Sequence, residues 1–149
     1  MRFLIQVVAN AEVKVDGEVT GKIDKGFLVF IGLTEGDTKE LAEKMVRKML
    51  NLRIFADENG KTNLSLSDVS GGVLAISQFT LYADCRKGNR PNFLKAMKPQ
   101  EAEELYEYCL KEIGKTIPDV GHGIFGADMK VSLLNDGPFT IILDSEEIF

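Results

Sequence analysis

The sequence predicts an α/β fold: a single domain, residues 1–149, in which a curved mixed β-sheet with barrel-like layers is covered by two main helices. The first observation is the length of 149 residues, which suits one complete hydrophobic core. The second is a series of short apolar or alternating runs, which are typical of strands. The third is a pair of segments, near 39–52 and 99–114, with apolar residues at helical spacing.

Composition excludes several classes of protein. Hydrophobic residues make up 44% of the chain and charged residues 28%, as in ordinary soluble proteins. The longest apolar runs are too short to cross a bilayer, and Gln6 interrupts the run near the N-terminus, which reads as a strand and not as an export signal. We therefore expect a cytoplasmic protein with no membrane partner, in which Cys85 and Cys109 are free thiols.

Net charge and metal-binding residue types narrow the choice of partners. The net charge of −5 argues against binding DNA as a duplex, which needs a broad basic face, but is compatible with contact to a single-stranded RNA end. The cysteines lack C-x-x-C spacing, and His122 is the only histidine. We therefore expect no metal site and no cofactor.

The first part of the chain reads as strands joined by tight turns. Residues 2–9 are expected to form a first strand, and the alternation around Lys14 indicates a second. Asp16-Gly17 is a strong hairpin signal, after which 18–23 returns as a further strand. The continuous apolar run 27–33 indicates a strand that is covered on both faces.

Each helix has a recognisable start. Asp37 is expected to cap the first, with Glu40 reaching back, and this helix should end near Leu52. Pro99 suits the first turn of the second helix, and Gly114 should end it. Residues beyond it, 116–127, are expected to form a glycine-containing connection. The buried face of the second helix is predicted to contain Ala102, Leu105, Tyr106, Cys109 and Ile113.

Two polar stretches are candidates for a functional site. The first, Ser77-Gln78-Phe79-Thr80-Leu81, directly follows the buried strand 73–76. Ser77 and Thr80 are candidate nucleophiles, but no base is evident, and hydroxyls at a strand end commonly bond the backbone. A Ser-His-Asp triad would need His122, which lies in a Gly-His-Gly segment without a carboxylate partner.

The second stretch, Asn135-Asp136-Gly137-Pro138, separates two strand-like runs, 129–134 and 139–143. Composition alone favours a hairpin turn, because all four residues are turn formers. The alternative is that Gly137-Pro138 presents its carbonyls to a ligand, with a cis peptide bond that would re-aim them. A basic segment, Arg86 to Arg90, is by itself better explained as a solvated loop.

Taken together, the two polar stretches resemble the signature motifs of the D-aminoacyl-tRNA deacylases, first described as D-tyrosyl-tRNA deacylases. Two separated motifs in the right order make the resemblance specific, and it reverses the preference for a simple hairpin at Gly137-Pro138. The likeness covers the whole chain, since other family landmarks stand at their expected places: Ile5-Gln6, Val15 to Val19, Arg53-Ile54-Phe55, Arg90 to Phe93 and Phe125 to Met129.

The resemblance implies a D-tyrosyl-tRNA deacylase-like fold and a hydrolase that cleaves the ester between a D-amino acid and the 3′-terminal adenosine of tRNA. It implies a homodimer, in which a cis Gly137–Pro138 of one subunit enters the pocket of the other. Its carbonyls would hold the substrate amino group and exclude L side chains, so that glycyl-tRNA is accepted too. One steric wall then serves every D-amino acid, and the enzyme would proofread after aminoacylation.

Residue roles follow from the same resemblance. The catalytic segment is Ser77, Gln78, Phe79 and Thr80. Backbone N–H groups near Phe79 and Thr80 would hold the ester carbonyl oxygen. The Phe79 ring would pack on the adenine. The substrate's own 2′-hydroxyl would help to activate water. Substrate binding and chiral selection fall to Asn135, Gly137, Pro138, Thr140 and Phe125, and contacts with RNA phosphates to Arg86, Lys87 and Arg90.

One position departs from the family pattern. Val7 stands where the family usually has an arginine that helps to hold the Gly-Pro loop. This leaves open an editing enzyme with a different stereochemical preference. Two further alternatives are a module that binds RNA ends without catalysis and a general Ser/Thr esterase, which the missing base disfavours.

Overall fold

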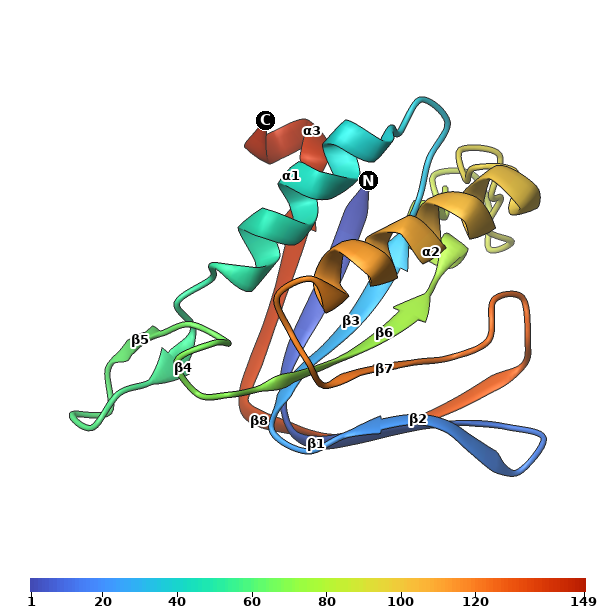
Figure 1. Cartoon of the computed structure of the whole chain (residues 1–149). Helices are drawn as coiled ribbons and strands as arrows, with labels where there is room; N and C mark the ends of the chain where they lie inside the picture. Colours follow the sequence, from blue (N-terminus) through green and yellow to red (C-terminus); the bar gives the residue numbers. More distant parts are fainter.

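The structure, a computed structural model, describes residues 1–149 (Figure 1). Its strands and helices alternate along the chain, and a short 3₁₀ helix, η1, stands between β6 and α2. In chain order the elements are β1 (Arg2–Val15), β2 (Glu18–Ile23), β3 (Gly26–Gly32), α1 (Lys39–Leu50), β4 (Phe55–Ala56), β5 (Thr62–Leu64), β6 (Gly72–Ser77), η1 (Phe79–Tyr82), α2 (Pro99–Gly114), β7 (Val120–His122), β8 (Met129–Asp144) and α3 (Ser145–Ile148).

The long strand β1 organises the main sheet because it pairs on both of its edges. β8 runs antiparallel along one edge, from the pair Arg2–Asp144 to the pair Val15–Met129. On the other edge, β3 pairs with the first half of β1 and β2 with the second half. β6 and β7 extend the sheet from β3 by parallel pairing, which makes the sheet mixed.

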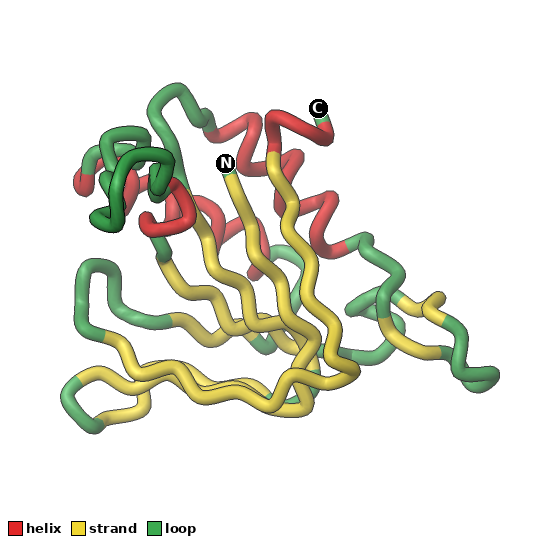
Figure 2. Tube along the Cα trace, turned by 180° about the vertical axis from the view of Figure 1, so that it is seen from behind, coloured by secondary structure: helices red, strands yellow, loops and turns green.

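The sheet bends along its long strands (Figure 2), so that β2 comes to lie beside β7. The approach is close at Gly21, where a Cβ atom would lie 2.6 Å from the backbone nitrogen of His122. Only glycine permits two backbones to come so near. The prediction of a curved mixed sheet with barrel-like layers, covered by helices, is therefore confirmed, and the sheet is nearly closed.

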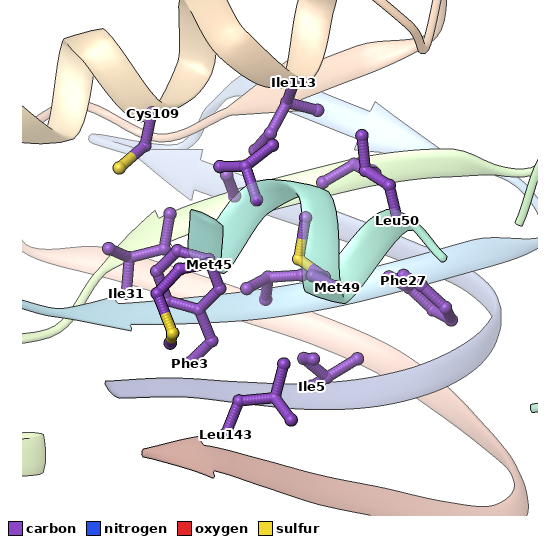
Figure 3. Packing of buried hydrophobic residues seen from close by; sticks show 14 of the residues in the cluster. Phe3, Ile5, Phe27, Ile31, Met45, Met49, Leu50, Cys109, Ile113 and Leu143 are labelled. Atoms are coloured by element: carbon purple, nitrogen blue, oxygen red, sulfur yellow. The ribbon is translucent and has the colours of Figure 1, made fainter. Parts of the chain in front are cut away.

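Apolar clusters cover both faces of the sheet. The larger cluster, of 24 buried residues, joins the sheet to α1 and α2 and includes Met45, Met49 and Ile113 (Figure 3). The smaller cluster, of 7 buried residues, lies on the opposite face. Phe27 belongs to the first and Leu28 to the second, so β3 is covered on both faces, as its continuous apolar sequence predicts.

Helix α2 matches its prediction, including its bounds and all five buried residues. Helix α1 differs at both ends. Its cap is Thr38, whose hydroxyl accepts from the Leu41 N–H at 3.2 Å. Asp37 instead pairs with the buried N-terminal ammonium group at 2.9 Å, because a buried charge needs an opposite partner. The helix ends at Leu50, since the Asn51 side chain bonds the Arg47 carbonyl at 2.8 Å.

Three strand predictions need correction. The two strands expected over 2–15 are one continuous strand, β1. The connection 116–127 contains β7, whose three residues are too few to show a period in sequence. The two C-terminal runs are one strand, β8, with no hairpin turn between them, because both halves pair with β1 in the same direction. No helix of the fold has the length and apolar character needed to cross a bilayer.

An ion pair ties the start of β1 to the end of β8. Arg2 Nε donates to Asp144 Oδ2 at 2.6 Å, and Arg2 Nη1 donates to the Leu81 carbonyl at 2.9 Å. Burial by itself would raise the pKa of Asp144, but the hydrogen bonds from Arg2 and from the Glu146 N–H outweigh it. The pKa of Asp144 in the folded protein is therefore below its ordinary value, and the charged carboxylate stabilises the fold.

We expect Asp144→Asn to lower the free energy of unfolding by about 1–3 kcal/mol at neutral pH, the usual cost of losing a hydrogen bond between charged groups. Because the pKa is lowered by folding, this contribution is complete above the ordinary carboxylate pKa and is lost as the pH falls through the folded value. Urea unfolding at a series of pH values should therefore show that the difference in unfolding free energy between wild type and variant becomes smaller in acid.

The control is Glu12→Gln, which removes an exposed ion pair with Lys14. It should change stability by less than about 1 kcal/mol, as exposed pairs usually do. The assignment of a stabilising Arg2–Asp144 ion pair would be contradicted by either of two results. The loss of unfolding free energy in Asp144→Asn could be no larger than in the control, or it could stay constant as the pH falls.

Candidate active site

The segment after β6 turns at the edge of the sheet. The Gln78 N–H donates to the Ile31 carbonyl of β3 at 2.8 Å, and the chain then enters η1. The Gln78 amide donates to the Thr80 hydroxyl at 2.7 Å. The Thr80 hydroxyl is thus held by an amide, whereas a nucleophile would need a base. The N–H groups of Phe79 and Thr80 begin a helix, so they have no partner within it.

A cavity of about 670 Å³ opens beside this segment. It brings together four of the predicted site residues, Ser77, Gln78, Phe79 and Phe125. Most of the remaining wall is apolar and comes from β3, the loop before α2, α2 itself and the start of β8: Ile31, Leu33, Ile76, Phe93, Leu94, Ala96, Met97, Lys98, Pro99, Ala102, Tyr106, Gly126, Ala127, Asp128, Met129 and Val131.

Phe79 presents an apolar face at this cavity. Its side chain is 57% exposed, which is unusual for phenylalanine, and its ring meets Phe93 edge-on with the centroids 5.0 Å apart. An exposed ring beside a cavity can stack on a flat, partly polar group such as a nucleobase.

Tyr106 of α2 is a cavity residue that sequence reasoning missed. Its hydroxyl donates to the Ala75 carbonyl of β6 at 2.9 Å, and burial raises its pKa well above the ordinary value. The hydroxyl stays protonated and fixes α2 against the strand that leads to Ser77. The only signal in the sequence was a tyrosine within an otherwise apolar helical stripe, which by itself indicates core packing.

The cavity contains no nucleophile paired with a base. His122 lies outside it, is exposed, and has Nδ1 2.8 Å from the Gly123 carbonyl. The buried Cys109 thiol has its pKa raised by burial to about 12, so it is not a thiolate at neutral pH. No three His, Cys, Asp or Glu side chains gather where they could bind a metal ion.

The second predicted stretch forms a bulge in β8. Between the pairs Gln6–Thr140 and Val8–Asn135, β1 advances two residues (6 to 8) and β8 advances five (135 to 140), so β8 carries three extra residues. These residues project from the sheet, as a bulge requires. Gly137 and Pro138 are exposed at its tip, and the peptide bond between them is cis.

Asn135 closes the base of this bulge. Its amide nitrogen donates to the carbonyls of Val7 at 3.1 Å and Phe139 at 3.0 Å, and its Oδ1 accepts from the Phe139 N–H at 3.2 Å. Gly137 has φ of +137°, and a Cβ there would lie 2.9 Å from the Phe139 nitrogen. Asparagine and glycine are therefore required at these two positions by the geometry of the bulge.

The two predicted halves of the site do not meet within one chain. None of Asn135, Gly137, Pro138 and Thr140 lines the cavity that contains Ser77 to Phe79. Thr140 instead accepts a hydrogen bond from the Gln6 amide at 3.3 Å on an exposed face of the sheet. The bulge is thus a projecting element whose tip contacts nothing in its own chain that could be a substrate pocket.

The predicted phosphate-binding residues lie on the exposed loop between η1 and α2. Arg86 is bound by Asp84, with Nε–Oδ1 and Nη2–Oδ2 distances of 2.9 and 2.5 Å. Lys87 and Arg90 form no ion pair. None of the three lines the cavity, so any contact with RNA from this loop lies outside the pocket itself.

Comparison with known families and proteins agrees with this geometry. The family model for D-Tyr-tRNA(Tyr) deacylase matches residues 4–144, nearly the whole chain. The chain belongs to the D-Tyr-tRNA(Tyr) deacylase family. A curated relative from Clostridium acetobutylicum, named D-aminoacyl-tRNA deacylase, is 50% identical over 100% of both chains. The family is one of ester hydrolases, so this chain is an enzyme of that class.

Two solved structures share the fold. One, described as c-Myc DNA Unwinding Element Binding Protein, has 42% sequence identity, a TM-score of 0.91, and covers 97% of this chain and 98% of its own. The other, described as a probable eukaryotic D-amino acid tRNA deacylase, has 17% identity and a TM-score of 0.85, and covers 95% of this chain and 97% of its own. The fold is thus retained at 17% sequence identity.

Proposed function

We propose that this protein hydrolyses the ester of D-aminoacyl-tRNA, and of glycyl-tRNA, to release the amino acid and tRNA. The observation that carries the proposal is the cavity beside Ser77 to Phe79, which offers backbone donors and an exposed aromatic ring but no base. An aminoacyl ester is already activated, so positioning and stabilisation of the oxyanion can supply much of the catalysis. Family membership supports the same reaction.

The terminal adenosine enters the cavity with its base against Phe79, whose ring is exposed and supported by Phe93. Water attacks the ester carbon, and the N–H groups of Phe79 and Thr80 hold the oxyanion that forms. The 2′-hydroxyl of the same adenosine accepts a proton from the attacking water and passes its own proton to the 3′-oxygen, which leaves as the 3′-hydroxyl of tRNA. Gln78 and Thr80 position this segment through their mutual hydrogen bond.

Chiral selection requires a second subunit. Gly137 and Pro138 project from β8 and lie outside the cavity of their own chain, so they can act only in the cavity of a partner. In a homodimer with two-fold symmetry, each subunit can insert its Gly137-Pro138 loop into the cavity of the other. The two-fold interface repeats each contact, so both cavities receive a loop. Their carbonyls receive the substrate amino group, and the wall they form excludes an L side chain.

Asn135 compensates for Val7 in this arrangement. The family usually has an arginine at position 7 to hold the loop, but here the Val7 side chain is buried and its carbonyl accepts from Asn135. The Asn135 side-chain amide also bonds the backbone carbonyl and N–H of Phe139, so it joins the two ends of the bulge. The loop is therefore held without the arginine. Strict chiral selection is therefore expected in spite of the substitution.

The primary test is the hydrolysis of D-tyrosyl-, L-tyrosyl- and glycyl-tRNA, measured side by side with EDTA present. The D and glycyl esters should be hydrolysed, and the L ester should be slower by at least about 10²-fold because its side chain meets the wall. Hydrolysis of the L ester at a similar rate would show that the wall is open. Binding of tRNA without hydrolysis of any ester would identify a binding module instead.

Thr80→Ala should reduce kcat far less than the ~10⁶-fold loss that follows removal of a catalytic serine in a hydrolase. The reason is that the Thr80 hydroxyl positions Gln78 and forms no bond to the substrate. Single-turnover hydrolysis of D-tyrosyl-tRNA measures this effect, with Thr62→Ala, a remote exposed threonine, as the control. A loss near 10⁶-fold would restore a covalent mechanism through Thr80.

Reciprocal insertion predicts complementation between two inactive variants. Ala127→Trp fills the cavity, and Pro138→Arg enlarges the projecting loop, which is exposed in its own chain and so should fold. Each homodimer should be inactive, whereas co-expressed subunits should form heterodimers with one intact site and give about a quarter of wild-type activity. Absence of any recovered activity in verified heterodimers would mean that loop and cavity act within one chain.

A further inference from the structure

A second hollow, of about 490 Å³, lies at the other end of η1 from the active-site cavity. Phe79 lines the first cavity and Tyr82 lines the second, and three residues of 3₁₀ helix span only about 6 Å. The two hollows are therefore neighbours. Three cationic side chains line the second one, and they come from distant parts of the chain: Arg2, Arg86 and Lys95.

Each of these side chains retains a hydrogen-bond donor. Arg2 uses Nε and Nη1 for Asp144 and Leu81, and Arg86 uses Nε and Nη2 for Asp84, so one guanidinium nitrogen of each is free. The Lys95 ammonium group makes no ion pair, since only the Lys95 carbonyl is engaged, by the Thr34 hydroxyl at 2.5 Å. Arginines held by carboxylates are oriented before any ligand arrives.

The loop that carries Arg86 and Lys95 is fixed at both of its ends. The backbones of Asp84 and Asn92 exchange two hydrogen bonds, at 2.8 and 3.1 Å, across the loop. Its far end is tied to β3, because the Met97 N–H donates to the Leu33 carbonyl at 3.0 Å. These bonds hold Arg86 and Lys95 at the hollow that Arg2 also lines.

The local charge favours an anion. The hollow has three positive side chains and one lining carboxylate, Asp84, while Asp144 lies behind Arg2. Because Asp144 pairs with Arg2 and Asp84 pairs with Arg86, the excess positive charge at the hollow is that of Lys95. The Tyr82 ring forms part of the wall, with the Arg2 guanidinium 4.6 Å above it, and the buried Tyr82 hydroxyl has no hydrogen-bond partner. The wall offers donors from Arg2, Arg86 and Lys95.

We propose that this hollow binds a backbone phosphate of the nucleotides that precede the terminal adenosine. The proposal rests on the proposed function, which places the adenosine in the neighbouring cavity beside Phe79. A single RNA strand that leaves that cavity along η1 meets Arg2, Arg86 and Lys95 next. The free donors contact phosphate oxygens, which carry no sequence information, so the site serves any tRNA.

The test compares Lys95→Gln with Lys61→Gln, an equally exposed lysine on the distant β4–β5 hairpin. Lys95→Gln should weaken binding of deacylated tRNA about five- to tenfold at low salt and lower the slope of log affinity against log salt by about 0.7, the value for one single-strand phosphate contact. Lys95→Arg should restore affinity, and Lys61→Gln should change neither quantity.

A second measurement separates phosphate binding from catalysis. The substrate 3′-O-D-tyrosyl-adenosine has no phosphate, so Lys95→Gln should leave its kcat/KM unchanged. For D-tyrosyl-tRNA, the same variant should raise KM five- to tenfold, as it raises the dissociation constant of deacylated tRNA, which corresponds to about 1 kcal/mol. Equal loss on both substrates, or no loss of tRNA affinity, would overturn the phosphate site. If the wild type hydrolyses neither substrate, the proposed function fails, and the binding comparison still decides whether this hollow contacts RNA.

Discussion

The pairing of β1 on both edges is the constraint on which the rest of the structure depends. One strand of 14 residues joins β8 along its whole length and divides its other edge between β3 and β2. A strand that changes partner midway must bend, and the bend brings β2 against β7. Both faces of the curved sheet then need cover, which the two apolar clusters provide. The helices can lie on one face only.

This constraint also positions the site. Because β3 and β6 are parallel, their carboxyl ends lie together, and the Gln78–Ile31 bond places the polar segment at that edge. Helix α2 is fixed to β6 by the Tyr106–Ala75 bond and forms the opposite wall. The result is an apolar cavity with polar backbone on one side. Such a site suits a substrate that brings its own reactive group and needs chiefly to be held.

The bulge in β8 depends on the same pairing. Both halves of β8 bond β1 in one direction, so the three extra residues have no partner and must project. A loop anchored at both ends by strand pairing, and closed by the Asn135 amide, is held far more firmly than a free surface loop. The proposed exclusion of L side chains needs a loop held in this way, because a wall that moves cannot reject a side chain.

Local sequence determined most of the elements of the fold. Asp16-Gly17, Pro99 and Gly114 are short-range signals, and they correctly predicted the β1–β2 hairpin and the bounds of α2. The residue motifs indicated the family, and Ser77 to Phe79 with Phe125 do share a cavity.

Only the tertiary structure decided the features that depend on long-range partners. Asn135 to Pro138 have the composition of a hairpin turn, yet they form a bulge, because pairing with β1 keeps both halves of β8 in one direction. Asp37 has the residue type and position of a helix cap, yet its carboxylate forms an ion pair with the N-terminal ammonium group. Arg2 and Lys95 lie 93 positions apart, and no local pattern joins them at one hollow. Local propensity fixes what a segment can form; the partner across the sheet decides what it does form.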